Sequence, residues 1–397
     1  MVKGALLETG FAASAMLQAA GDGPDARAQA LIASYARAGY ARAEPAILQP
    51  AEPFLDLSGE DIRRRMYLTS EASGRELCLR PDLTIPVSRD YLASAAGAAG
   101  EPMGFCYLGP VFRQRGEAPG EFLQAGIESF GRRDTAAADA ETLALGLEAI
   151  SHYGIEAPEI RVGDVGLFTA LIDALELPPA WRRRLAKDFH RAGSLAHDLD
   201  RLRLDAARRG PEYQGLLAAL AGSDLRAAHG LVTDLLSIAG ITTVGGRSVG
   251  EIADRFLEQA ALGGSARLPA ETQAVIERFL KIAGNPDEAA ADLRALAEET
   301  GVALAPAIDL MESRTGFFAA QGIEVAPMRF STAFGRGVDY YTGFVFEIHD
   351  RQARVAGQLV GGGRYDALLS RLGAKNPIPA VGFAVWIERL MAIGSKP

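Results

Sequence analysis

The chain has 397 residues, of which 48% are hydrophobic and 23% are charged. This length and composition predict a globular protein with one large core or two smaller ones. The formal net charge of -9 argues against a surface built for phosphate backbones, because nucleic-acid binding is driven by clustered Lys and Arg, although a local basic patch stays compatible with it.

The cysteines and histidines bound the chemistry further. Cys78 and Cys106 are the only cysteines, with no CxxC, and the five histidines form no i,i+4 pair. We therefore expect no metal site and no disulfide framework, and a reducing compartment. The apolar stretch 10–20 is Ala-rich and follows Glu8, which favours a helix or frayed tail over a leader. No other run approaches the ~18 apolar residues of a membrane span, so we expect a cytoplasmic protein that does not contact a membrane.

The first part of the chain is predicted to form strands framed by two helices. Helical spacing with a glycine behind it predicts a helix over 26–38. Extended segments joined by polar turns, which favour an antiparallel sheet, are predicted at 40–48, 77–79, 104–112 and 122–130. The Ala-Gly stretch 93–100 is predicted to be flexible, and a second helix is predicted over 135–152.

The remainder of the chain changes period twice. From 167 to 320, Ala, Leu, Arg and Glu recur with helical periodicity, which predicts a helical insert. A period of two returns in FVFEIH and RVAGQLVGGG, predicted as a β-hairpin across a DRQA turn, and a final helix is predicted over 381–393. We therefore expect a core made of 1–166 and 321–397, divided by the insert 167–320.

Strand alternation in FLQAGIESF points to a ligand-binding face. It places Gln124, Gly126 and Glu128 on one side, because successive strand side chains point to opposite faces. A polar face with a central glycine suits a small ligand lying flat on it. For an isolated strand, an ordinary solvent-facing side explains the same pattern equally well.

Two further strings carry polar groups suited to an amino acid. In LRPDLTIP, Asp82 and Thr84 share one side if the segment is extended, and the prolines around them discourage a helix. In GRGVDYYTG, Arg336 precedes Tyr340 and Tyr341 at a strand entry. Carboxylates near an arginine suit a zwitterion, whose ammonium and carboxylate need opposite partners. The alternative for Arg336 with Asp339 is a structural salt bridge.

GGGRYD, at 361–366, is rich in glycine and invites comparison with phosphate-binding loops. It lacks the Lys and Ser/Thr of a P-loop and has no dinucleotide-binding spacing. Close backbone packing at the end of a hairpin is the better explanation for these glycines.

These strings occur together in the order of a known family. CYLGPVFR…EFLQAGIESFG is similar to motif 2 of class II aminoacyl-tRNA synthetases, RGVDYYTGFVFE and GGGRYDALL resemble the two histidine-specific signatures, and AVGFAVWIERL resembles motif 3. Pro45 matches the motif 1 proline. The resemblance covers about 25–168 and 327–390 and is to histidyl-tRNA synthetases and their paralogues. It implies an α+β class II fold, a mixed, largely antiparallel sheet flanked by helices, and a homodimer through motif 1.

The same resemblance implies a histidine-binding site. By position, its residues are Asp82, Thr84, Gln124, Glu128, Arg336, Tyr340 and Tyr341. The first three would hold the ammonium, Arg336 the carboxylate, and Glu128 with Tyr341 the imidazole. Arg113 and Arg389 match residues that meet ATP phosphates and would be a phosphate-binding remnant. No catalytic residue, cofactor or metal is implied.

The departures from the family fall where a synthetase handles ATP and tRNA. Arg115 replaces a Glu, and the loop 112–122 is short and carries Glu117 and Glu121, which would repel a triphosphate and an acceptor stem. Trp386 replaces a glycine beside the nucleotide, where an indole leaves no room. The seven residues after Leu390 are too few for an anticodon-binding domain, so we expect no tRNA binding and no aminoacylation.

This pattern of losses resembles the regulatory subunits of ATP phosphoribosyltransferase, which are synthetase paralogues. Asp82 in LRPDLTIPVSR, where synthetases have Glu, is also similar to that group. The resemblance implies a non-catalytic subunit that assembles with a short-form catalytic subunit in the first step of histidine biosynthesis. A retained histidine site would then sense histidine for feedback inhibition. The alternatives are a histidine-activating, ATP-dependent ligase and a binding scaffold with a vestigial pocket.

Overall fold

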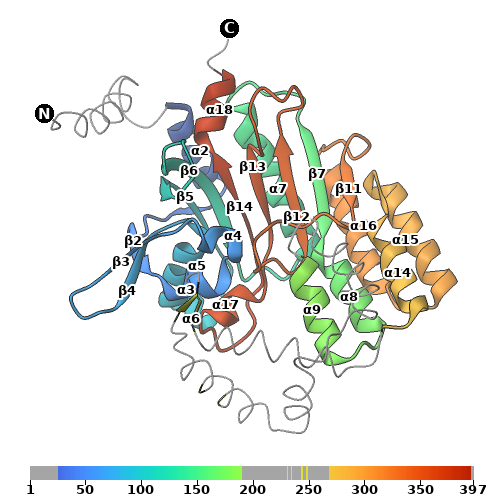
Figure 1. Ribbon diagram of the computed structural model, residues 1–397. Helices are drawn as coiled ribbons and strands as arrows, with labels where there is room; N and C mark the ends of the chain where they lie inside the picture. The colour runs from blue at the N-terminus through green and yellow to red at the C-terminus, as the bar shows by residue number, and fades with distance from the viewer. Residues whose placement is uncertain are drawn as a thin grey trace, which may run out of the picture. The chain divides into compact units, whose positions relative to one another are not determined.

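The computed structural model describes residues 26–189, 230, 234, 243–244, 247–248 and 268–394 (Figure 1). The chain forms two compact units. The first consists of Met1–Arg161, Phe317–Pro327 and Phe346–Pro397, and the second of Val162–Gly316 and Met328–Val345. Within the described ranges, no helix has the length and apolar character needed to cross a membrane.

A mixed sheet forms the centre of the first unit. Its strands lie in the order β1 (Ala41–Arg42), β5 (Met103–Phe112), β6 (Glu121–Phe130), β14 (Ala380–Trp386), β13 (Val360–Arg364) and β12 (Phe344–His349). β1 runs parallel to β5, whereas the β5–β6, β6–β14 and β14–β13 pairs are antiparallel. The predicted sheet, mixed and largely antiparallel, is confirmed.

One face of this sheet is covered by helices and forms the hydrophobic core. The helices are α2 (Ala26–Arg37), α7 (Thr135–Ser151) and α18 (Ile387–Gly394), and Figure 1 shows α7 lying along β13 and β14. Tyr35 of α2 meets Phe383 of β14 edge-on, with 5.9 Å between ring centroids. Gly146 of α7 lets the helix approach the sheet, since a Cβ there would lie 3.3 Å from the Phe346 ring. Gln124 and Glu128 project from the opposite face.

A small second sheet and several short helices complete the first unit. The antiparallel sheet has the order β2 (Leu48–Pro50), β4 (Glu76–Leu79) and β3 (Tyr67–Ser70). The short helices are α3 (Glu52–Leu57), α4 (Glu60–Arg63), α5 (Thr84–Ala93), α6 (Ala95–Ala99) and α17 (Leu368–Arg371). Every residue of β3 is exposed, which is unusual for a strand outside an interface.

Most elements predicted for the first part are confirmed, with three corrections. The helix at 26–38, the strands at 77–79, 104–112 and 122–130, and the helix at 135–152 are present. The stretch 40–48 is extended only at its two ends. The segment 93–100 contains helix α6, because Ser94 caps it by accepting from the Gly97 N–H at 3.1 Å. Pro86 does not prevent helix α5, since it lies in the first turn, where its missing N–H has no acceptor.

The prediction of a helix over 381–393 is wrong in its first half. Ala380–Trp386 is strand β14, at the centre of the sheet, and the helix begins only at Ile387. The run AVGFAVW is apolar on both faces because both faces are covered, so it has no period that could separate strand from helix. The hairpin strands at 344–349 and 360–364 are present, but the second begins later than predicted.

The second unit is mostly helical in its described ranges. Its helices are α8 (Val165–Ala174), α9 (Pro179–Phe189), α14 (Ala270–Leu280), α15 (Pro286–Thr300) and, for most of its length, α16 (Ala305–Ala320). Its strands are β8 (Thr243–Val244), β9 (Arg247–Ser248), β10 (Ala283–Gly284), β11 (Arg329–Ser331) and, from Val162 onward, β7 (Glu159–Asp164). The predicted helices of the remaining insert lie outside the described residues.

Candidate functional site

The face of β6 predicted to bind a ligand exists and is closed off from solvent. Gln124, Gly126 and Glu128 alternate along the strand and are all buried. Across the strands, Gly126 stands opposite Tyr107 of β5, and Glu128 stands opposite Gly382 of β14. The explanation by a solvent-facing strand is therefore excluded.

Two glycines make room for polar groups on this face. A side chain at Gly126 would lie 2.5 Å from the Tyr107 hydroxyl, and one at Gly382 would collide with the Glu128 carboxylate. Real Cβ atoms do not approach neighbours so closely, so both positions require glycine. The space that side chains would take at these two positions is occupied by the Tyr107 hydroxyl and the Glu128 carboxylate.

Three hydroxyl groups hold the Glu128 carboxylate in place. Thr84 Oγ1 donates to Oε1 at 2.7 Å, and the Tyr107 hydroxyl, 3.3 Å from the same oxygen, shares its one proton between that oxygen and the Phe383 carbonyl at 3.1 Å. The Tyr365 hydroxyl donates to Oε2. These donors come from α5, β5 and the segment after β13, and all of them are neutral. Among the described residues, no Lys, Arg or His forms an ion pair with Glu128, so the carboxylate keeps its capacity for a cationic or N–H-bearing ligand.

Burial perturbs both carboxyl groups of this cluster. It raises the pKa of Glu128 to about 8, against the lowering effect of the three hydroxyls, and the nearby Asp82 raises it further. Burial also raises the pKa of Asp82, while Arg113 and the backbone N–H groups of Ile85 and Thr84 lower it. Strongly perturbed carboxyl groups that lie together are typical of functional sites.

Gln124 is the least satisfied polar side chain of the cluster. It is 1% exposed, and neither its amide nitrogen nor its amide oxygen has a hydrogen-bond partner among the described residues. Its cross-strand neighbours are Gly109 and Trp386. Buried polar groups are almost always hydrogen-bonded, so an amide lacking partners at both ends points to a ligand.

The other three predicted histidine-binding residues belong to the second unit. There the Arg336 guanidinium donates to the Tyr341 hydroxyl at 2.8 Å, and its Cζ lies 5.5 Å from the centre of the Tyr341 ring. The rings of Tyr340 and Tyr341 are 5.0 Å apart, and all three side chains are buried. The structure thus groups the seven predicted residues into a set of four in one unit and a set of three in the other.

The arginines that match phosphate-binding positions make contacts within the chain. Arg113 Nε donates to the Pro81 carbonyl oxygen at 2.6 Å. Arg389 Nη1 donates to the Gln358 carbonyl oxygen at 2.5 Å, and its guanidinium lies over the Trp386 ring at 5.2 Å. Both arginine side chains are therefore engaged in contacts with their own chain.

The loop between β5 and β6 is a tight turn. The Arg113 N–H donates to the Gly120 carbonyl at 2.8 Å, and Arg115 forms a bridge with Ala118. Arg115 also forms a bidentate ion pair with Glu388 and packs over the Phe122 ring at 4.2 Å. The turn is therefore bonded to α18 through Arg115 and is held together by its own backbone hydrogen bonds.

Sequence reasoning missed three contributors to the cluster. Tyr107 and Gly382 become visible only through the register of β5 and β14 against β6, and Tyr365 only through the pairing of β13 with β14. The explanation offered for GGGRYD is confirmed, because a Cβ on Gly362 would lie 2.5 Å from the Phe383 Cβ. Its tyrosine, rather than its glycines, reaches the candidate site. In the described ranges, no group of His, Cys, Asp and Glu is arranged to hold a metal.

Comparisons with known proteins agree with the motif order. A family model described as histidyl-tRNA synthetase matches residues 25–230 and 217–390. The ATP phosphoribosyltransferase regulatory subunits of Brucella canis, Brucella melitensis and Brucella abortus are each 42% identical to this chain over 352 residues. That alignment covers 88% of this chain and 92% of each relative.

Solved structures show the same fold. An ATP phosphoribosyltransferase regulatory subunit/histidyl-tRNA synthetase from Bacillus halodurans matches 93% of this chain and 78% of its own, with a TM-score of 0.63 and 22% identity. A histidine–tRNA ligase subunit from Alicyclobacillus acidocaldarius matches 94% of both chains, with a TM-score of 0.55 and 26% identity. These likenesses confirm the class II synthetase fold. The chain belongs to the histidyl-tRNA synthetase-like family, and within it to the ATP phosphoribosyltransferase regulatory subunits.

Proposed function

We propose that this chain is the non-catalytic regulatory subunit of an ATP phosphoribosyltransferase in the cytoplasm, where it assembles with a short-form catalytic subunit and senses histidine. The observation that carries the histidine proposal is the Gln124 amide, which is buried, has no hydrogen-bond partner among the described residues and shares its face of β6 with Glu128. A site that keeps such groups in a family of regulatory subunits has a ligand to satisfy them.

Histidine complements these groups chemically. Its ammonium suits Asp82, its imidazole offers an N–H donor to Glu128, and the Gln124 amide can both donate to and accept from the amino acid. Its carboxylate requires a cation, and the family resemblance alone assigns that role to Arg336, which donates to the Tyr341 hydroxyl within the second unit. Thr84 fixes the Glu128 carboxylate from the side of α5.

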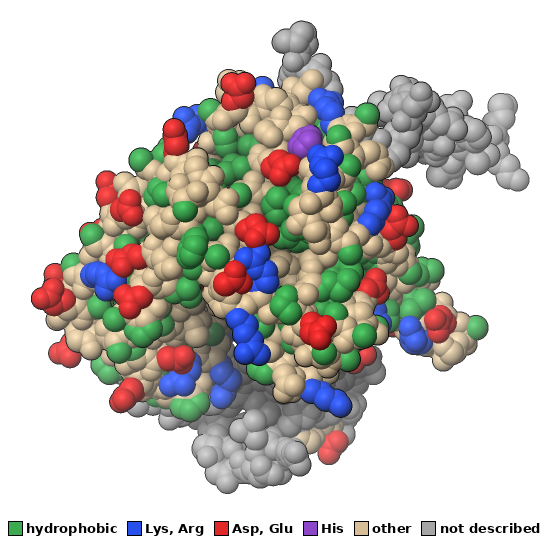
Figure 2. Space-filling view, turned by 180° about the vertical axis from the view of Figure 1, so that it is seen from behind, with side chains coloured by type: hydrophobic (Ala, Val, Ile, Leu, Met, Phe, Trp, Pro, Cys, Tyr) green, Lys and Arg blue, Asp and Glu red, His purple; other side chains and the backbone are tan. Residues whose placement is uncertain are grey.

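The absence of ligase activity is proposed on the surroundings of the nucleotide position. Arg389 lies over Trp386, and Arg113 donates to the Pro81 carbonyl, so both arginines that match ATP-binding positions are engaged within the protein. Glu117 and Glu121 stay exposed in and beside the tight turn, where they would repel a triphosphate. On the face shown in Figure 2, Lys and Arg side chains are interspersed with Asp and Glu, which does not favour tRNA.

We also propose that the chain pairs with itself through the small sheet that follows the motif 1 proline, Pro45. Four large apolar side chains are exposed there: Ile47, Leu48, Tyr67 and Leu68. Leu48 and Leu68 are 52% and 50% exposed, on the two outer strands of the sheet. Exposed apolar groups that gather on open strands mark interfaces, and a two-fold contact buries the same patch of both copies.

Calorimetry with the purified chain tests the histidine proposal. Histidine should bind and alanine should not, and Glu128→Ala should weaken histidine more than Asp82→Ala, because Glu128 meets the imidazole and Asp82 only the ammonium. Loss of one partner of a charged hydrogen bond typically costs about 1–3 kcal/mol. Equal affinity for histidine and alanine, or an unchanged affinity in Glu128→Ala, would count against the assignment.

A further inference from the structure

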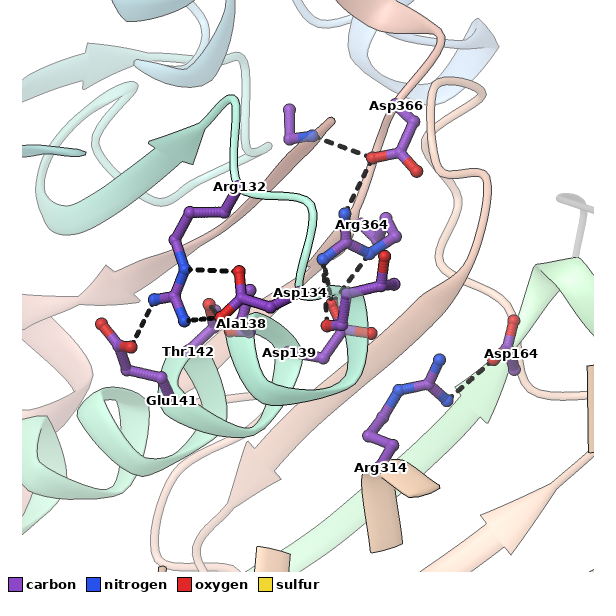
Figure 3. A network of polar contacts seen from close by, with 12 residues as sticks. Arg132, Asp134, Ala138, Asp139, Glu141, Thr142, Asp164, Arg314, Arg364 and Asp366 are labelled. Atoms are coloured by element: carbon purple, nitrogen blue, oxygen red, sulfur yellow. Dashed lines mark hydrogen bonds and ion pairs between the residues drawn. The ribbon is translucent and has the colours of Figure 1, made fainter. Parts of the chain in front are cut away.

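The end of strand β13 connects helix α7 with the Glu128 cluster. Arg364 is the last residue of β13 and Tyr365 follows it, so their side chains point to opposite sides of the sheet. On the α7 side, the Arg364 guanidinium bonds to Asp139 Oδ1, at 2.9 Å from Nε and 2.7 Å from Nη2. It also donates to the Thr135 carbonyl at 3.3 Å. Figure 3 shows this arginine reaching from the strand to the first turns of the helix.

A third group ties the arrangement to the neighbouring strand. Asp366 Oδ1 accepts from Arg364 Nη1 at 2.9 Å and from the Ala380 N–H at 2.8 Å. The Tyr365 N–H in turn donates to the Ala380 carbonyl at 2.8 Å. The backbone of Tyr365 is therefore held between two members of the network and the first residue of β14.

The burial of the Asp139–Arg364 ion pair suits it to fixing the position of its neighbours more than to stabilising the fold. Asp139 is fully buried and the Arg364 side chain is 4% exposed. A buried ion pair contributes little net stability because desolvation offsets its attraction, while its geometry is well defined. Arg132 forms ion pairs with Asp134 and Glu141 near the start of the same helix, but these are partly exposed, and in the described part of the chain no hydrogen bond joins them to Glu128 (Figure 3).

We propose that Asp139, Arg364 and Asp366 are positioning residues of the ligand site, which hold the Tyr365 hydroxyl on Glu128 and thereby fix the direction of its carboxylate. The identification of the ligand as histidine rests on the proposed function above. The positioning of Glu128 rests on the contacts alone. The other groups that face Glu128 are Thr84 from α5, Tyr107 from β5 and Asp82.

Two readouts test the proposal separately. The first is the pH midpoint at which the infrared carbonyl band of protonated Glu128 disappears, with the band assigned by its loss in Glu128→Gln. Tyr365→Phe removes a donor that stabilises the carboxylate, so the midpoint should rise by about one pH unit. Asp139→Asn should raise it in the same direction, and Arg132→Ala should leave it unchanged. The second is histidine affinity by calorimetry, which should fall roughly tenfold in Tyr365→Phe and Asp139→Asn.

The outcomes separate this proposal from the proposed function. If folded Asp139→Asn keeps the wild-type midpoint and affinity, the positioning proposal is wrong. If Asp139→Asn does not fold, Asp366→Ala makes the same test, since Asp366 is partly exposed and anchors both Arg364 and Ala380. If wild-type protein does not bind histidine, the function proposal fails, while the infrared midpoints still support or refute positioning.

Discussion

Replacing Gln124 by Leu should make the free protein more stable and abolish histidine binding. Leu has a similar volume, and the change removes two buried polar atoms that have no partner in the described part of the chain. Leaving such a group unsatisfied costs about 1–3 kcal/mol. In a domain of roughly 150–250 residues, about 1 kcal/mol moves the melting midpoint by 2–4 °C, so the variant should melt several degrees above wild type.

Gln49 provides the matched control. It is also buried, but its amide nitrogen donates to the Ala46 carbonyl at 2.8 Å and its oxygen accepts from Arg89 at 2.7 Å. Gln49→Leu should therefore destabilise the protein by about 1–3 kcal/mol, because it leaves those partners unpaired. The opposite signs at two buried glutamines isolate hydrogen-bond satisfaction from the effect of side-chain size.

Melting curves with and without histidine complete the assay. At a histidine concentration about 100 times the Kd, binding should stabilise wild type by about 2.7 kcal/mol, and the Gln49 variant by the same amount. The Gln124 variant should show no histidine-dependent shift. A Gln124→Leu protein that melts below wild type and still responds to histidine would refute the inference that this amide awaits a ligand.

Three further outcomes are expected. The pKa of Glu128 is about 8 in the folded chain against an ordinary 4.5, so the folded chain holds this proton more tightly than the unfolded chain. As pH rises from about 5 to about 9, the urea midpoint of wild type should therefore fall relative to that of Glu128→Gln. Parallel pH profiles of the two proteins would contradict this. On the proposed obstruction of the nucleotide position by Trp386 and the β5–β6 turn, the purified chain should catalyse no histidine-dependent ATP–pyrophosphate exchange. Robust exchange would favour the ligase alternative. In sedimentation experiments, the Leu48→Asp and Leu68→Asp variants should be monomers. Leu310→Asp, which changes another exposed apolar position, should remain a dimer. If all three variants are dimers, the small sheet is not the interface.

Local patterns were sufficient to predict the β6 face but not its surroundings. Alternation alone places Gln124 with Glu128, because a strand has only two faces. Tyr107 and Tyr365 reach the same carboxylate from strands distant in sequence, and only strand register brings them there. Whether Gln124 has hydrogen-bond partners depends on all of its neighbours in the fold, and a local sequence pattern does not contain them.

The errors in the predicted elements have physical causes of the same kind. The run AVGFAVW forms a strand covered on both faces, so its apolar residues show no alternation that could exclude a helix. Pro86 disfavours a helix in general but not in the first turn, and Asp82 Oδ1, ahead of the N-cap Leu83, accepts from the Ile85 N–H at 3.3 Å. Helix boundaries of this type depend on caps rather than on composition.

We propose above that this chain makes the activity of an ATP phosphoribosyltransferase responsive to histidine. The direct measurement is the activity of its cognate short-form catalytic subunit, with and without this chain, across a range of histidine concentrations, together with the size of the complex. We predict that the two chains form a hetero-oligomer that histidine inhibits, and that histidine does not inhibit the catalytic subunit alone. The Arg336→Ala complex should assemble but lose its histidine sensitivity, because a coupling between sites, typically about 1–3 kcal/mol, requires that the ligand binds. An Arg336→Ala complex inhibited at the wild-type histidine concentration, or no complex at all, would contradict the account.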